Sequence, residues 1–407
     1  MDELRTLPGG LYRIPGVRLA STCAGIQRHD RDDLVLIEIA AGGQCAAVFT
    51  RNAFCAAPVA IARRHLLGRT PPRYLLVNSG NANAAMGELG LEDALSSCRR
   101  TGVTMGCAPE EVLPFSTGVI GERLPVERIE RALPVLRTTL SDSGWEAAAR
   151  AIMTTDTVPK ACSIAVQAAG QTVHVTGIAK GAGMIHPDMA TLLAFVATDA
   201  TIAAPLLQRC LGDAVTRSFN RISVDGDTST NDACVLIATG QSAAPAITAP
   251  ESPGHAEVGE AIAAVCIHLA QAIVRDGEGA TKFVSIEVSG GRSEAECLRV
   301  ARTVACSPLV KTALFASDPN WGRIAAAVGR APIPDLEART VSIAINDCTV
   351  LERGARAAGY TDQQGRDALA GREVAIRIAL GRGESGSTFW TCDLSHDYVN
   401  INADYRS

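Results

Sequence analysis

Apolar residues recur along the chain with two periods, which predict an alternation of strands and helices. Short apolar runs predict strands at 34–39, 46–49, 74–77, 162–168, 172–178 and 192–197, the first two forming a hairpin around a glycine turn at 41–43. Apolar positions every three or four residues predict helices at 91–103, 126–139, 205–219 and 256–275. We expect strands again at 339–352, 373–380 and 387–394, after a strand, a proline turn and a helix start within 311–323.

Length and composition narrow the class of protein. A chain of 407 residues is too long for one small domain, so two or three lobes are expected. Hydrophobic residues make up 47% but aromatic residues only 4%, and small aliphatic side chains must therefore fill the core. The net charge of −5 argues against a nucleic-acid-binding protein, which normally carries a basic face.

Cysteines and histidines give no sign of a disulfide framework or a metal site. The 13 cysteines are scattered without a C-x-x-C pair, and the 7 histidines show no metal-ligand spacing. The acidic start of the chain does not resemble a signal peptide, and no run of about 18 apolar residues would span a membrane. We therefore expect a cytoplasmic protein with reduced thiols and no metal.

The stretch at 180–195, KGAGMIHPDMATLLAF, carries the strongest chemical signal. Thr191 heads an apolar run, and a β-branched side chain there is stiff at χ1, which holds its hydroxyl near the preceding carbonyl of Ala190. Attack on that carbonyl and hydrolysis of the ester would free the α-amine of Thr191, which can then act as the base for its own hydroxyl. An α-amine has a pKa near ~7.7–8.0, and a cation such as Lys180 would lower it. The spacing alone favours the more ordinary interpretation, a surface turn that leads into a strand of which Thr191 is the first residue.

Four further loops are rich in small polar residues. They are NSGNAN (78–83), FSTGVIG (115–121), the MTTDTVPK run (153–160) and DGDTSTND (225–232). A Thr-Gly pair can offer a hydroxyl and a bare N–H to one oxyanion, but such loops also occur as turns and caps. The acidic residues of the last loop suggest a calcium-binding loop, but their spacing is not that of an EF-hand. The DGEGATK segment at 276–282 likewise lacks the phosphate-loop spacing.

These segments resemble, in order and over nearly the whole chain, the ornithine acetyltransferase (ArgJ) family of arginine biosynthesis. Asp188 stands where that family more often has Asn, a departure that bears on the cutting rate and leaves the nucleophile unchanged. The resemblance implies an α/β layered fold, with sheets flanked by helices and the nucleophile strand buried centrally. It also implies self-cleavage between Ala190 and Thr191 into an α chain (1–190) and a β chain (191–407) that remain associated, as a dimer of such pairs.

The resemblance also implies the reaction and its residues. Acetyl would move from N2-acetyl-L-ornithine to L-glutamate through an acetylated Thr191, without a cofactor. Thr117 and Gly118 would hold the oxyanion. The implied substrate-binding residues are Thr154, Lys180, Thr191, Glu278, Asn402 and Ser407.

Three alternatives stay open at the level of sequence. The enzyme could also take acetyl from acetyl-CoA, as bifunctional members of the family do. It could be an N-terminal-nucleophile amidohydrolase or aminopeptidase of the same fold. It could also be an uncleaved relative that only binds a partner.

Overall fold

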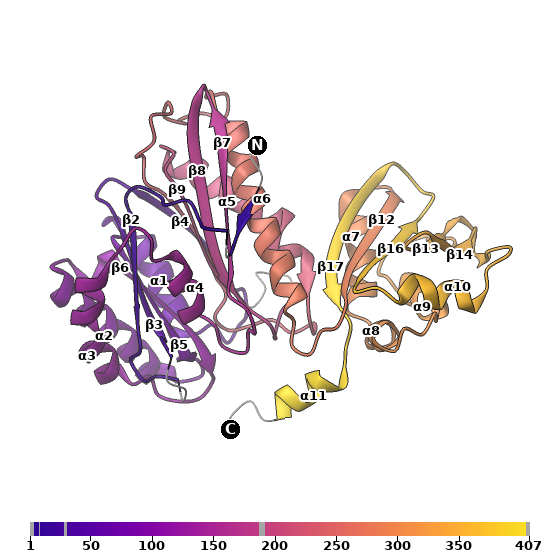
Figure 1. The fold of residues 1–407 in the computed structure, drawn as a ribbon, viewed down its shortest axis with the longest axis horizontal. Helices are drawn as coiled ribbons and strands as arrows, with labels where there is room; N and C mark the ends of the chain where they lie inside the picture. The colour runs from indigo at the N-terminus through magenta and orange to yellow at the C-terminus, as the bar shows by residue number, and fades with distance from the viewer. Residues whose placement is uncertain (1–3, 8, 28–30, 187–191, 404–407) are drawn as a thin grey trace. The chain divides into compact units, whose positions relative to one another are not determined.

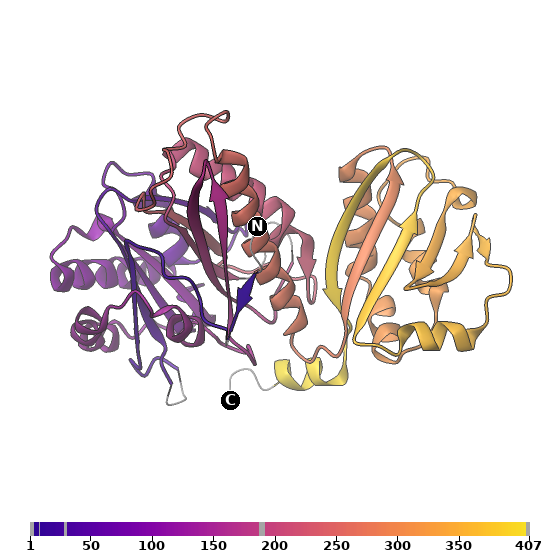
Figure 2. The same ribbon diagram turned by 45° about the horizontal axis from the view of Figure 1, so that its top comes forward.

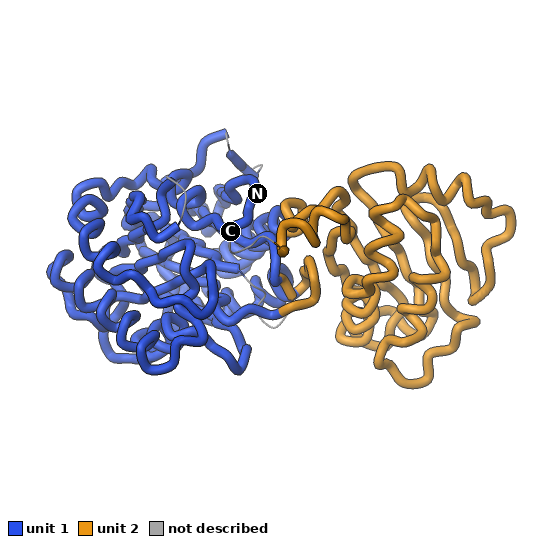
Figure 3. The backbone as a smooth tube through the Cα atoms, turned by 90° about the horizontal axis from the view of Figure 1, so that it is seen from below, with its two compact units in different colours: residues 1–184, 188–220, 228–273 blue, residues 185–187, 221–227, 274–407 orange. Residues whose placement is uncertain are grey.

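Three β-sheets organise the part of the chain that the structure describes. The computed structural model describes residues 4–7, 9–27, 31–186 and 192–403. These belong to two units: unit 1 comprises 1–184, 188–220 and 228–273, and unit 2 comprises 185–187, 221–227 and 274–407 (Figure 3). Ala190, Thr191, Asp188 and Ser407 lie outside the described residues.

Unit 1 contains two sheets. The first has the strand order β2-β3-β5-β6, with bounds Val17–Thr22, Leu34–Ile39, Tyr74–Asn81 and Val112–Val119. The second has the order β1-β7-β8-β9-β11-β4, with bounds Arg5–Thr6, Lys160–Ala168, Gln171–Lys180, Leu193–Thr198, Ala233–Ala238 and Gln44–Phe49.

The helices of unit 1 cover the outer faces of these sheets (Figures 1 and 2). Against the first sheet lie α1 (Ala57–Leu66), α2 (Gly87–Met105) and α3 (Val126–Thr139). Against the second lie α5 (Ala204–Arg217) and α6 (His255–Arg275), while α4 (Trp145–Ala151) packs at the edge of the core between the sheets. The predicted layered α/β fold is therefore confirmed.

Strand β9 lies in the middle of the second sheet, between β8 and β11. All of its residues are buried. The ring of Phe195 packs in a T-shaped contact against the ring of Phe115, which lies in the first sheet, with 5.2 Å between the ring centroids. The sequence expectation of a buried central strand directly after Thr191 is thus confirmed. The expected boundary between the α and β chains would fall inside unit 1, between two adjacent strands of this sheet.

The predicted hairpin at 34–49 is wrong. β3 pairs with β2 and β5 in the first sheet, whereas β4 pairs with β11 in the second. The turn at 41–43 therefore carries the chain from one layer to the other. The reason is burial: β3 is covered by the inter-sheet core on one face and by helices on the other, and a short apolar run does not specify its partner strand.

Unit 2 is built on one sheet with the order β10-β17-β12-β16-β13-β14-β15. The strands are Ile222–Ser223, Ser385–Cys392, Phe283–Gly291, Glu373–Ala379, Ser342–Ile345, Cys348–Glu352 and Ala355–Arg356. Its core joins the sheet to helices α7 (Glu294–Ala305), α8 (Pro308–Phe315), α9 (Trp321–Gly329) and α10 (Asp362–Leu369). The chain's last described helix is α11 (His396–Ala403).

The strand predicted at 311–316 is a helix, α8. Pro308 occupies the first turn, where a missing N–H costs nothing and the fixed φ favours a helix. One face of this helix is buried, through Val310, Lys311, Ala313 and Leu314. These positions are spaced by three or four residues, but in a short, mostly apolar run a helical period is not distinguishable from a strand.

Helix α6 is, among the described residues, the one helix long and apolar enough to cross a membrane by length and composition. Ile262, Val265 and Leu269 on it are fully buried, and Val265 and Leu269 face Gly177 of β8, where a Cβ would stand 2.8 Å from Val265. Its apolar face therefore serves the core of unit 1.

Replacing Phe195 with Ala should lower the free energy of unfolding of unit 1 by about 3–5 kcal/mol, because a large side chain with 0% exposure leaves a cavity between the sheets. The matched control is Phe54→Ala, since Phe54 is 74% exposed and should change stability little. Denaturant unfolding followed by fluorescence measures both. Equal losses for the two variants would contradict this account of the core.

Candidate active site

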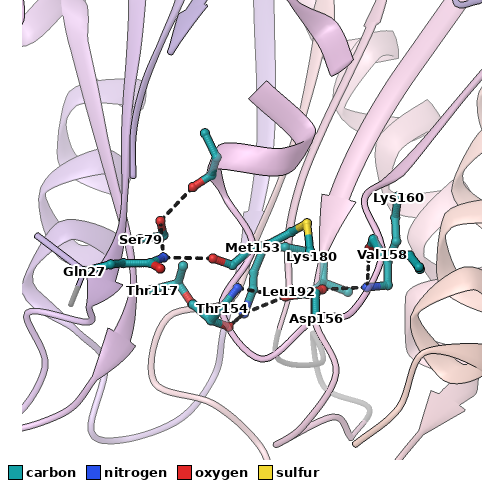
Figure 4. Close-up of polar contacts among 12 residues, drawn as sticks. Gln27, Ser79, Thr117, Met153, Thr154, Asp156, Val158, Lys160, Lys180 and Leu192 are labelled. Atoms are coloured by element: carbon teal, nitrogen blue, oxygen red, sulfur yellow. Dashed lines mark hydrogen bonds and ion pairs between the residues drawn. The ribbon is translucent and has the colours of Figure 1, made fainter. Parts of the chain in front are cut away.

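Lys180, the last residue of β8, gathers hydroxyl groups from two other segments. Its ammonium group is nearly buried, and its Nζ donates to Thr154 Oγ1 at 2.6 Å and to Thr117 Oγ1 at 3.3 Å (Figure 4). In the β8–β9 ladder Lys180 lies opposite Leu193, so the start of β9 runs beside it. The structure thus unites three of the residues that the resemblance singles out.

The two threonine hydroxyls are oriented by this lysine. An ammonium group can only donate, so each hydroxyl oxygen accepts from Lys180 and keeps its own proton for a further acceptor. Beside Thr117, Gly118 has φ +132°, and a Cβ there would stand 2.3 Å from the carbonyl carbon of Gly80. Only glycine fits this bulged junction of β5 and β6, which leaves a Thr-Gly pair without a blocking side chain.

Asp156 supplies the counter-charge for two buried lysines. Its Oδ1 accepts from Lys160 Nζ at 2.6 Å and from the Gly181 N–H at 2.7 Å, and its Oδ2 lies 4.0 Å from Lys180 Nζ. Burial by itself would raise the pKa of Asp156, but the charges of Lys160 and Lys180 and these hydrogen bonds outweigh it. The pKa is therefore lowered well below its usual range, and the carboxylate stays ionised.

The loop that carries Thr154 is fastened to the first sheet. Gln27 Nε2 donates to Ser79 Oγ at 2.6 Å and to the Met153 carbonyl at 2.9 Å, and Ser79 Oγ donates to the Ala151 carbonyl at 2.7 Å (Figure 4). Arg31 binds the Met153 carbonyl as well. These contacts, together with the Thr154 N–H to Asp156 Oδ2 bond at 3.0 Å, fix where the Thr154 hydroxyl lies.

The NSGNAN loop, left open between a functional loop and a turn, has a structural use for its amide groups. Asn78, Asn81 and Asn83 each donate a side-chain N–H to a backbone carbonyl at 2.8–3.1 Å. These hydrogen bonds satisfy a side-chain N–H of each buried asparagine.

Asn231 and Asp232, at the end of the DGDTSTND motif, are site residues whose roles the sequence reasoning missed. Asn231 Nδ2 donates to the Ala82 and Ser116 carbonyls at 2.7 and 2.9 Å, which ties the motif to the strand of Thr117. Asp232 Oδ1 accepts the N–H of Leu192 at 3.0 Å. Burial raises the pKa of Asp232 well above its usual range, against the opposing effects of that N–H and of Lys180.

Unit 2 brings together Glu278 and Asn402. Glu278 is buried, and its Oε2 accepts from Asn402 Nδ2 at 2.8 Å. Gly279 follows with φ +67°, and a Cβ there would stand 2.6 Å from Ser395 Oγ. Ser395 Oγ in turn donates to the Gly279 carbonyl at 2.6 Å, so helix α11 is held on the turn that carries Glu278.

The sequence-predicted site residues therefore form two groups, Thr117, Gly118, Thr154 and Lys180 in unit 1, and Glu278 and Asn402 in unit 2. Ala190, Thr191 and Ser407 lie outside the described residues. Within the described ranges, no three His, Cys, Asp or Glu side chains are grouped so as to hold a metal ion.

Comparison with known proteins gives consistent matches. The family model described as "ArgJ family" matches residues 18–407. The "Arginine biosynthesis bifunctional protein ArgJ" of Methylococcus capsulatus is 57% identical over 410 residues, covering 100% of this chain and 98% of that protein. The protein of the same name from Pseudomonas fluorescens is 53% identical, covering 98% of each. A crystal structure of argJ from Bacillus halodurans is 39% identical with a TM-score of 0.48, covering 50% of this chain and 95% of that one.

Replacing Asp156 with Asn should destabilise unit 1 by about 3–5 kcal/mol at pH 7, because it removes the buried carboxylate that faces both Lys160 and Lys180. The pKa of Asp156 is lowered on folding, so its contribution is complete above the unfolded pKa of about 3.9 and is lost as pH falls below it. Wild-type stability should therefore drop below about pH 4, and the variant should show a smaller drop.

Thermal unfolding between acid and neutral pH measures this effect. Asp142→Asn is the control, since the Arg13–Asp142 pair has side-chain exposures of 65% and 50% and is worth about 0–1 kcal/mol. A neutral-pH melting temperature of Asp156→Asn equal to that of the wild type would show that the lysines do not depend on this carboxylate.

Proposed function

This chain belongs to the ArgJ family, and from that membership we propose that it is an acetyltransferase of arginine biosynthesis, moving acetyl from N2-acetyl-L-ornithine to L-glutamate. One structural observation supports the proposal at specific residues: Lys180 is hydrogen-bonded to both Thr117 and Thr154, beside the start of β9. Three separate segments contribute to that meeting, and each holds a residue that the family resemblance assigns to the reaction.

In the first half-reaction, Thr191 Oγ attacks the acetamide carbonyl of acetylornithine, and its proton passes to the Thr191 α-amine. The carbonyl oxygen becomes an oxyanion that accepts from the Thr117 hydroxyl and the Gly118 N–H. Each such donor is typically worth about 3–4 kcal/mol of barrier. The C–N bond then breaks, the α-amine returns the proton to the departing nitrogen, and ornithine leaves an acetyl ester on Thr191.

In the second half-reaction, the Thr191 α-amine takes a proton from the amine of glutamate as that amine attacks the ester carbonyl. The bond between the acetyl carbon and Thr191 Oγ then breaks, the α-amine returns the proton to Oγ, and N-acetylglutamate leaves. Both amino acids present an α-carboxylate, so one pocket can serve both halves of the cycle. Lys180, with Thr154 bound to it, is suited by its charge to a carboxylate, and Asn402 and Ser407 contribute polar groups. Glu278 is suited to the amino end of the substrate, and Asn402 orients its carboxylate.

Self-cleavage supplies the free amine that this cycle needs. Thr191 Oγ attacks the Ala190 carbonyl, the Ala190–Thr191 C–N bond breaks, and water hydrolyses the resulting ester. β9 and β11 would belong to the β chain and are flanked by β8 and β4 of the α chain. The two products would therefore stay joined by two complete strand ladders, which supports the proposal that the α and β chains remain associated. We further propose that two such pairs assemble as α2β2 in the cytoplasm.

A second activity is favoured by the word "bifunctional" in the relatives' names. We include acetylation of glutamate from acetyl-CoA on the same threonine, which would be seen as steady turnover of these two compounds without acetylornithine. The amidohydrolase alternative has less support, because family membership favours transfer to an amine over transfer to water.

Replacing Thr191 with Ala should abolish both self-cleavage and acetyl transfer, because one hydroxyl carries out both reactions. Thr191→Ser keeps a hydroxyl and an α-amine and should retain measurable cleavage. Intact-mass spectrometry for a chain that begins at residue 191, and an assay of N-acetylglutamate formation, measure the two reactions. Normal formation of N-acetylglutamate by Thr191→Ala would refute the mechanism.

Replacing Thr117 with Val should lower kcat of the cleaved enzyme roughly 10²–10³-fold with a small change in KM, because it removes a donor that acts on the oxyanion. Thr117→Ser retains the donor and should recover most of the activity. Thr101→Val is the matched control, since Thr101 is also buried and its hydroxyl donates to the Ser97 carbonyl of α2 at 2.8 Å. A loss confined to KM would assign Thr117 to substrate binding instead.

A further inference from the structure

The backbone on the upstream side of the proposed cut is held at Ile185. The Ile185 N–H donates to Asp225 Oδ1 at 3.0 Å, and the Ile185 carbonyl accepts from the Val224 N–H at 2.9 Å and from Ser223 Oγ at 2.9 Å. Ile185 is fully buried, so both of its peptide groups need these partners. All of these residues belong to unit 2.

The backbone on the downstream side is held at Leu192 in a corresponding way. The Leu192 N–H donates to Asp232 Oδ1 at 3.0 Å, and the Leu192 carbonyl accepts from the Ala233 N–H at 3.1 Å. Asp232 is 1% exposed, and its second oxygen has no hydrogen-bond partner among the described residues. These residues all belong to unit 1.

We propose that Asp225 and Asp232, the first and last residues of the DGDTSTND motif, are positioning residues for self-cleavage, each fixing the backbone on one side of the cut. The proposal rests on the proposed function, since it presumes that the chain cuts itself before Thr191. It assigns a role to a motif whose acidic residues invite a calcium reading and whose spacing excludes an EF-hand loop.

The chain crosses from unit 2 to unit 1 at two places near the proposed cut. One crossing lies between residues 185 and 192 and the other between residues 225 and 232. The first residues of the two stretches, Ile185 and Asp225, are hydrogen-bonded to each other, and so are the last, Leu192 and Asp232. An attack by a side chain on its own preceding carbonyl depends on backbone geometry, and small misplacements cost large factors in rate. Carboxylates suit this task because they accept backbone N–H groups with short side chains that have few rotamers.

Each carboxylate is itself held in place. Asp225 Oδ1 also accepts the Asp227 N–H at 3.2 Å, and its Oδ2 accepts from the Tyr398 hydroxyl at 3.4 Å. Next to Asp232, Asn231 is tied to the Ser116 carbonyl directly before the Thr117–Gly118 pair. Burial favours the neutral form of Asp232, in which the acceptor oxygen toward Leu192 is retained, so an Asn side chain is a close substitute.

The experiment follows the fraction of full-length chain that is cleaved with time, by denaturing electrophoresis and intact mass. Asp225→Ala and Asp232→Ala should each slow cleavage roughly 10- to 100-fold, since each removes the side chain that accepts the backbone N–H of one flank. Asp225→Asn and Asp232→Asn keep an acceptor oxygen and should recover most of the wild-type rate. Should the Ala variants fail to fold, Ser223→Ala, which removes one of the three bonds to Ile185, should still slow cleavage measurably.

Two controls separate positioning from general loss of stability. Asp199 in unit 1 accepts the His174 N–H at 2.8 Å, and Asn346 in unit 2 accepts the Ala375 N–H at 2.8 Å, both away from the cleavage segment. Asp199→Ala and Asn346→Ala should lower the melting temperature but cleave at the wild-type rate.

Two results would overturn the proposal alone: wild-type cleavage rates in Asp225→Ala and Asp232→Ala, or equal slowing in the two controls. A wild-type chain that never yields a fragment beginning at Thr191 would overturn the proposed self-cleavage and this proposal with it.

Discussion

The candidate site depends on how a buried positive charge is neutralised. Lys180 can lie inside unit 1 because Asp156, itself neutralised by Lys160 and the Gly181 N–H, offsets its charge. A single buried ammonium group without such a partner would lose its proton or open its surroundings to water. With the partner in place, Lys180 orients the hydroxyls of Thr117 and Thr154, so electrostatics and catalytic geometry share one cluster.

The sheet around this cluster would hold the two chains together after the proposed cut. β9 and β11 pair in parallel in the middle of the sheet, and each also pairs with a strand that precedes the proposed cut. Breaking one peptide bond between β8 and β9 removes none of these ladders. The same arrangement brings the beginnings of β9 and β11 together, which is why Asp232 can hold Leu192.

The two units contribute different chemistry. Unit 1 provides the positive charge, the hydroxyls and a Thr-Gly pair whose glycine has no side chain to block its N–H, and these groups suit an oxyanion and a carboxylate. Unit 2 provides Glu278, oriented by Asn402, which suits an amine. The amino-acid donor and acceptor of the proposed reaction carry both a carboxylate and an amine.

The sequence by itself determined the elements whose signal is local, and it pointed to the residues of the candidate site. Buried strands such as 192–197 and helices such as 126–139 follow from periodicity, and family resemblance identified Thr117, Thr154 and Lys180, which the fold then brings together. Only the tertiary structure decided which strands pair and which side chains come into contact. It separated β3 from β4, made 311–316 helical, and gave Asp156, Asn231 and Asp232 their roles. The physical reason is that strand pairing, burial and charge neutralisation join residues far apart in the chain, and no local pattern specifies which of them will meet.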